Sequence, residues 1–91
     1  MTDYMVERRL PGFTAEHLRA AAGRARSATE LMTREGTPIR YLRSTYLPGE
    51  EKCFCLFQAP SEEDVREANR RAELPVERVV EVLQVAADDL R

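Results

Sequence analysis

Two glutamates and one arginine stand out because their side chains could bind an ion or move a proton. Glu7 and Glu81 each lie within an apolar, strand-like run, and Arg43 lies in a third such run. When two carboxylates lie close together, the pKa of one rises, a cation binds between them, or a basic side chain neutralises them. The sequence leaves three roles open for Glu7 and Glu81: metal ligands, a general acid/base, or ion pairs with Arg43 or Arg9.

The second candidate group is a pair of thiols. Cys53 and Cys55 are two residues apart, so they point to the same side of a strand. Two thiolates make half of a zinc site, and the chain has no other cysteine and only one histidine, His17. A four-thiolate site across a two-fold axis would complete the set. The favoured interpretation is two free, buried cysteines that act as small hydrophobic side chains.

No familiar catalytic motif accompanies these residues. The sequence has no Gly-rich phosphate loop, no Ser-His-Asp set and no HExxH motif. His17 follows Glu16 in the first turn of an expected helix, where a surface position is expected. Tyr41 and Phe57 are expected to line a pocket or an interface. Because a nucleophile would have no base beside it, we predict no catalytic residue.

The composition narrows the class of protein. The 91 residues are enough for one domain, residues 1–91, and 43% hydrophobic with 33% charged residues is typical of a globular chain. The net charge of −2 argues against nucleic acid as a main partner. No apolar stretch approaches the roughly 20 residues of a membrane span, and the N-terminus does not resemble a signal peptide. We therefore expect a soluble, cytoplasmic protein.

Six elements are expected to position the candidate residues. Thr14 and Ser61 are good N-caps, and Pro11-Gly12, Gly36 and Pro75 separate the runs. The pattern predicts strands over residues 2–10, 39–47, 52–58 and 76–85, and helices over 14–35 and 61–74. This order predicts an α+β fold, a ferredoxin-like βαββαβ sandwich whose four-stranded antiparallel sheet carries two helices on one face.

The alternation of side chains along each strand predicts which residues lie on each face of the sheet. The side beneath the helices is predicted to hold Val6, Leu42, Phe54, Leu56, Val80 and Val82. The open face is predicted to hold Met5, Glu7, Ile39, Tyr41, Arg43, Cys53, Cys55, Phe57, Val79, Glu81 and Leu83. The first strand of this fold lies between the third and the fourth, which would make Glu7 and Glu81 neighbours. Such a face is too apolar for water, so we expect a homodimer of the dimeric α+β barrel type.

Several segments resemble one family of small bacterial proteins. They are Tyr-Met-Val-Glu-Arg at 4–8 with Leu-Pro-Gly at 10–12, residues 36–44, residues 53–61 with Ala-Pro-Ser, and residues 74–82 with Leu-Pro-Val. The sequence is similar to a family known mostly as a domain of unknown function, which includes a nickel-binding protein. The resemblance implies a ferredoxin-like dimer and raises metal binding. Several relatives carry a histidine where this chain has Arg43, and an arginine cannot coordinate nickel.

Three functions follow as hypotheses. The first is a non-enzymatic dimeric module that binds a small ligand, or nickel or another divalent metal, in a cavity on the open face. Its predicted ligand-binding residues are Glu7, Tyr41, Arg43, Cys53, Cys55, Phe57 and Glu81, with Glu7 and Glu81 as metal ligands. The second is a small cofactor-free enzyme, an oxygenase or isomerase, that uses a carboxylate with a raised pKa in that cavity. The third is a structural dimer without a ligand.

Overall fold

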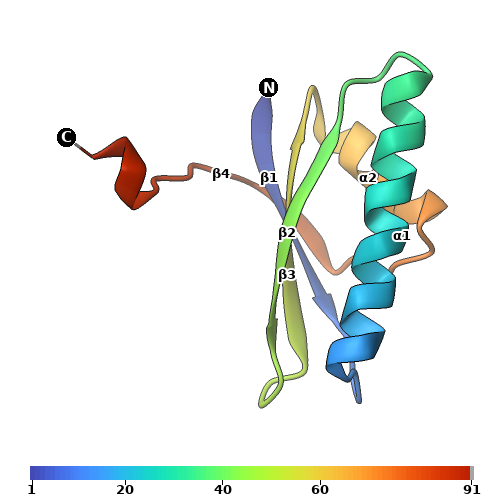
Figure 1. Ribbon diagram of the computed structural model, residues 1–91, viewed down its shortest axis with the longest axis vertical. Coiled ribbons are helices and arrows are strands. Elements are labelled where there is room, and N and C mark those ends of the chain that lie inside the picture. Colours follow the sequence, from blue (N-terminus) through green and yellow to red (C-terminus); the bar gives the residue numbers. More distant parts are fainter. Residues whose placement is uncertain (91) are drawn as a thin grey trace.

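The strands and helices follow one another in the predicted order, βαββαβ. The computed structural model describes residues 1–90 (Figure 1). Its elements are β1 (Thr2–Arg9), α1 (Ala15–Arg34), β2 (Arg40–Leu47), β3 (Lys52–Ala59), α2 (Glu62–Arg71), β4 (Arg78–Val82) and a short 3₁₀ turn at Ala87–Asp89. The predicted fourth strand was too long at both ends.

The four strands form one antiparallel sheet in the order β2-β3-β1-β4. Both helices cover one face of this sheet and leave the other face open (Figure 1). This arrangement confirms the predicted ferredoxin-like α+β fold. No helix within residues 1–90 is long and apolar enough to cross a membrane.

Both helices begin at the predicted caps. The backbone amide of His17 donates to Thr14 Oγ1 at 3.1 Å, and the amide of Thr14 donates back to His17 Nδ1 at 3.2 Å. The amide of Asp64 donates to Ser61 Oγ at 3.3 Å. These bonds satisfy amides that the first helical turn leaves without partners.

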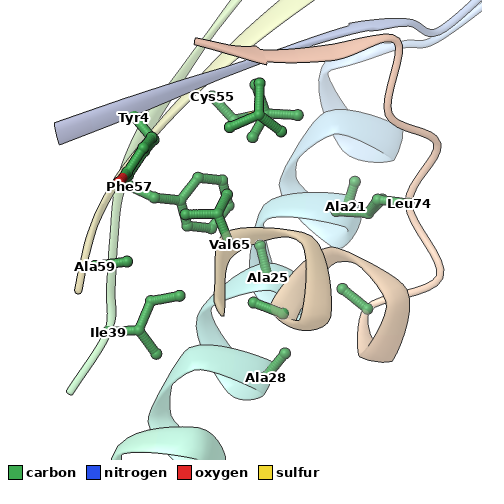
Figure 2. Packing of buried hydrophobic residues seen from close by; sticks show 14 of the residues in the cluster. Tyr4, Ala21, Ala25, Ala28, Ile39, Cys55, Phe57, Ala59, Val65 and Leu74 are labelled. Carbon is green, nitrogen blue, oxygen red and sulfur yellow. The ribbon is translucent and has the colours of Figure 1, made fainter. Parts of the chain in front are cut away.

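Small side chains let α1 lie close to the sheet. Ala21, Ala25 and Ala28 are buried at helical spacing on its inner side. The space above the sheet is filled by larger side chains, such as Phe57 from β3 and Val65 from α2, which are both fully buried (Figure 2). The core therefore pairs small residues on the helix with large residues on the strand and on α2.

The predicted faces of β3 and β4 were wrong. Cys53, Cys55 and Phe57 lie beneath the helices, 0%, 5% and 0% exposed. The open face carries Phe54, Leu56, Val80 and Val82, since Met5 of β1 lies opposite both Leu56 and Val80. Val79 is buried in the core, and Leu83 lies beyond β4 and is 92% exposed. The cause is that β3 and β4 are apolar on both faces, so apolar content did not distinguish them.

A bulge in β2 made the predicted face of Tyr41 and Ile39 wrong as well. Tyr41 pairs with Phe57 and Arg43 with Leu56, so Leu42 is an extra residue without a partner in this register. One extra residue reverses the alternation of side chains along a strand. Tyr41, and the buried Ile39 before it, therefore lie on the helix side, whereas Arg43 lies on the open face as predicted.

Candidate functional site

A shallow hollow on the open face contains the predicted site residue Arg43. It measures about 360 Å³ and is lined by Met5, Arg43, Thr45, Phe54 and Leu56. The register places Met5, Leu56 and Arg43 side by side across β1, β3 and β2. Its volume lies at the small end of the range of ligand pockets, about 300–1,000 Å³.

Among residues 1–90, Arg43 is the only basic side chain that lines this hollow. Its Nη2 donates to Gln84 Oε1 at 3.0 Å, and Arg43 forms no ion pair with a carboxylate of residues 1–90. An arginine fork without a carboxylate partner can hold an anionic group through two parallel hydrogen bonds. The hollow therefore combines apolar walls with one available positive charge.

Glu7 also lies on the open face, but it is already neutralised. Its carboxylate accepts a hydrogen bond from Arg78 Nε at 2.8 Å and lies 3.3 Å from Lys52 Nζ. These two cations lower the pKa of Glu7 below its ordinary value. Glu7 thus forms the ion pairs that the sequence left open, with Lys52 and Arg78 in place of Arg43 or Arg9.

The expectation that Glu7 and Glu81 are neighbours is wrong. Glu7 lies opposite Arg78 across the β1–β4 pairing, whereas Glu81 lies opposite Tyr4. Opposite residues of an antiparallel pair share a face, so Glu81 points to the helix side, at the exposed edge of the sheet. Within residues 1–90, no group of three His, Cys, Asp or Glu side chains could hold a metal ion.

Four predicted site residues do lie together, but beneath the helices. Cys53 Sγ lies 3.7 Å from Cys55 Sγ, and Ser44 Oγ lies 2.9 Å from Cys55 Sγ. The Tyr41 hydroxyl lies 2.7 Å from Ser44 Oγ, and its ring contacts that of Phe57, with centroids 5.5 Å apart. Figure 2 shows Cys55 and Phe57 pointing from the sheet toward the helices. Copies paired through the open face would therefore keep their thiols apart, so a four-thiolate site cannot form in that way.

Arg8 belongs to the same cluster, and the sequence analysis missed it. Its side chain is 1% exposed and lies opposite Cys53. Nη2 donates to Asn69 Oδ1 at 2.8 Å, Nη1 donates to the Pro75 carbonyl at 2.9 Å, and Nε has no partner. Its position could have been predicted from the alternation of β1, because Tyr4, Val6, Arg8 and Leu10 all point inward.

The two thiols differ in acidity. A hydrogen bond from Cys53 and the charge of Arg8 lower the pKa of Cys55 to about 6, even though burial opposes this change. The pKa of Cys53 is raised, because it donates to Cys55, is buried and lies beside the Cys55 charge. Both directions favour thiolate character at Cys55 over Cys53.

Comparison with known proteins confirms the resemblance. Residues 4–82 match the family described as "Nickel responsive protein SCO4226-like". The crystal structure of SCO4226 from Streptomyces coelicolor A3(2) has a TM-score of 0.75 and 22% identity, covering 92% of this chain and 99% of that one. At this identity the structural likeness supports the fold alone. No curated protein matches the sequence. The match to residues 4–82 nevertheless spans most of the sequence, and the chain therefore belongs to the family of nickel-responsive SCO4226-like proteins.

Proposed function

We propose that this protein is a non-enzymatic binding module that pairs with a second copy through the open face of the sheet. The observation that carries the proposal is the hollow around Arg43, which places one unpaired cation among apolar side chains. In such a dimer the two hollows would face one another and exclude water from a small ligand.

The chemistry of the open face favours a second copy as its cover. Its apolar residues run across β1, β3 and β4 and include Met5, Phe54, Val80 and Val82. A contiguous apolar surface of this kind is typical of an interface. A two-fold arrangement would bury the same patch on both copies at once.

The C-terminal segment supports the same partner. After β4 the chain runs away from the sheet on the side opposite the helices (Figure 1). Leu83, Val85 and Leu90 in this segment are 92%, 74% and 70% exposed. A second copy on the open face would give these side chains an apolar surface to contact.

The ligand that best fits the hollow is a small organic anion with an apolar body. Arg43 would hold a carboxylate or sulfonate group, while Met5, Phe54 and Leu56 would contact the apolar part. Displacing the Arg43–Gln84 hydrogen bond would free the guanidinium for this contact.

Nickel is the second candidate, because the family is described as nickel responsive. Within residues 1–90 one chain offers no set of three metal ligands, so a nickel site would need side chains from both copies. Glu81 is exposed, and among residues 1–90 it forms no ion pair, so it is the predicted ligand still available. Because Glu81 points to the helix side at the β4 edge, such a nickel site would require two copies to meet at that edge and not through the open face.

Sedimentation and dye binding test the proposal. We expect the protein to sediment as a dimer and Phe54→Glu to sediment as a monomer, whereas Leu31→Glu, which adds the same charge to the exposed side of α1, remains dimeric. Anilinonaphthalene sulfonate is the probe ligand. Arg43→Gln should bind it about tenfold more weakly, because a charge-assisted hydrogen bond is lost. A monomeric wild type, or equal binding by Arg43→Gln, would refute the proposal.

Calorimetric titration with nickel tests the second candidate. The wild type and Glu81→Ala, both stripped of metal with a chelator, are compared. Binding at a fixed ratio per chain that is lost in Glu81→Ala would support a shared nickel site. If neither protein takes up nickel, the metal interpretation fails and the organic anion stands alone.

A further inference from the structure

We propose that Cys53 and Cys55 form a peroxide-reactive thiol pair, in which Cys55 attacks hydrogen peroxide and Cys53 closes a reversible disulfide. The site lies on the helix side of the sheet and does not depend on the binding function of the open face. Four observations support it: the spacing of the thiols, the buried charge of Arg8, a cavity beside them and the geometry of β3.

The two sulfur atoms are placed for two successive steps. Cys53 Sγ and Cys55 Sγ are 3.7 Å apart, so the second thiol is already in contact with the first. Ser44 Oγ, at 2.9 Å from Cys55 Sγ, can donate to a thiolate, and the Tyr41 hydroxyl supports Ser44. Reactive cysteines are typically acidic and lie next to a second cysteine that resolves them.

A negatively charged partner would stabilise the buried guanidinium of Arg8. Within residues 1–90 it forms no ion pair with a carboxylate; its acceptors are the Asn69 side chain and the Pro75 carbonyl, both neutral. An uncompensated buried charge is costly, so a thiolate at Cys55 would serve as the counter-ion. The lowered pKa of Cys55 agrees with this role.

A small cavity provides a place for the reactant. It has a volume of about 10 Å³ and is lined by both cysteines, Arg8 and Ser44, with walls of Leu10, Leu18, Ala21, Ala22, Ala25 and Leu74. This volume is about that of one water molecule. Apolar walls and the Arg8 charge disfavour a metal cation here, whereas a small neutral molecule such as hydrogen peroxide could enter if the side chains around the cavity move slightly.

The chemistry is a balanced two-electron oxidation. The Cys55 thiolate attacks one peroxide oxygen, the O–O bond breaks, and hydroxide leaves while Cys55 becomes a sulfenic acid. Cys53 then attacks the Cys55 sulfur, an S–S bond forms, and the departing hydroxide takes the proton of Cys53 to give water. In total one thiolate, one thiol and one peroxide give one disulfide, one water and one hydroxide, and the hydroxide takes a proton from the solvent to become a second water. Small thiols reverse the reaction and become a disulfide themselves.

The backbone makes this disulfide easy to reduce. Two residues along a strand span roughly 6.6 Å, close to the upper limit of about 6.8 Å for the Cα separation across a disulfide. Closing the bond would therefore strain β3, and strained disulfides are the labile ones.

The test is mass spectrometry of the folded protein after treatment with hydrogen peroxide at neutral pH. We expect the wild type to lose the mass of two hydrogen atoms within one chain and to regain it with dithiothreitol. Cys53→Ser should instead accumulate a sulfenic acid at Cys55 that dimedone traps. Cys55→Ser should react at least tenfold more slowly, because burial still raises the pKa of Cys53 when the Cys55 thiol is absent.

Two controls test whether the reactivity of Cys55 depends on the Arg8 charge and on the size of the cavity. Arg8→Met should shift the pH dependence of dimedone trapping at Cys55 upward, whereas Arg8→Lys, which keeps the charge, should shift it less. A bulky reagent, cumene hydroperoxide, should react at least tenfold more slowly than hydrogen peroxide because of the cavity size. Trapping at Cys53 in place of Cys55, no intramolecular disulfide, or equal rates for the two peroxides would overturn the proposal.

Discussion

At the scale of single residues, Arg8 has the most unusual environment. It is 1% exposed, and within residues 1–90 no carboxylate pairs with it. Its neutral partner Asn69 is itself fixed by a 2.7 Å hydrogen bond from Nδ2 to the Val65 carbonyl of α2. Removing a hydrogen-bond partner of such a buried charge lowers the stability of the fold strongly, because the charge remains buried without that partner.

A double-mutant cycle measures this effect. Asn69→Leu should lower the free energy of unfolding by about 2–4 kcal/mol, since it leaves Nη2 of Arg8 without its side-chain acceptor. Combining it with Arg8→Met should restore most of the loss, because no buried charge remains. Urea denaturation gives both values. A loss in the double variant equal to the sum of the single losses would contradict the argument.

The acidity of Cys55 predicts a pH-dependent stability. Its pKa is lowered to about 6 in the folded chain, against about 8.5 for an ordinary cysteine, so the stabilisation is present above pH 8.5 and is lost as the pH falls toward 6. The pKa of Cys53 is raised, so its contribution is lost as the pH rises above 8.5. The free energy of unfolding of the wild type, relative to a variant with both cysteines replaced by serine, should therefore be greatest near pH 8.5 and should fall on either side. A difference independent of pH, measured by urea denaturation, would contradict this prediction.

At the scale of elements, the contact between α1 and the sheet depends on small side chains. Ala25 is 2% exposed and lies on the inner side of α1. Ala20 lies on the same helix but is exposed. The two positions therefore separate the effect of packing from the effect of helix propensity.

Ala25→Leu should lower the free energy of unfolding by about 1–3 kcal/mol, because the added methyl groups have no space. Ala20→Leu is the matched control and should change it by less than about 0.5 kcal/mol. Thermal or urea denaturation compares the two. Equal effects at both positions would show that α1 does not pack as closely as described.

Comparison of the predicted and observed elements shows which features of the fold the sequence can predict. Thr14 and Ser61 marked both helix starts correctly, since a cap is a local hydrogen bond. The face of β3 was missed, although Lys52 and Gln58 share the alternation of Phe54 and Leu56 and indicate the open side. The bulge at Leu42 had no local signal, because it depends on how β2 pairs with β3.

Some residues that the sequence singled out lie close together, but their arrangement was not predictable. Tyr41, Cys53, Cys55 and Phe57 do gather, while Glu7 and Glu81 separate once β4 is paired with β1. A shift of one residue in pairing moves a side chain to the other face, and pairing is a long-range property.

At the scale of the whole molecule, the chain has one covered face and one bare face. The helices shield the thiol cluster, whereas no helix covers the open face, where Met5, Phe54, Val80 and Val82 are half-buried, or the projecting C-terminal segment (Figure 1). Both uncovered features lie on the same side of the sheet, so one partner would cover both.

Removal of residues 83–91 should weaken pairing without unfolding the sheet, because these residues lie beyond β4. We expect the dimer dissociation constant from sedimentation to rise at least tenfold, since the exposed Leu83 and Val85 would no longer be buried against the second copy. An unchanged constant would exclude the segment from the interface, and a monomeric wild type would exclude the interface altogether.

The alternation of side chains along β3 has one more consequence. Phe54, which lines the hollow, stands between Cys53 and Cys55 on the same stretch of backbone. If closing the disulfide bends this stretch, the two sides of the sheet are energetically coupled. An anion held beside Phe54 would then make the thiols harder or easier to oxidise. By thermodynamic reciprocity, oxidation would change the affinity for that anion by the same factor. Through β3, oxidation of the thiols on one face of the sheet and anion binding on the other face would thus influence each other.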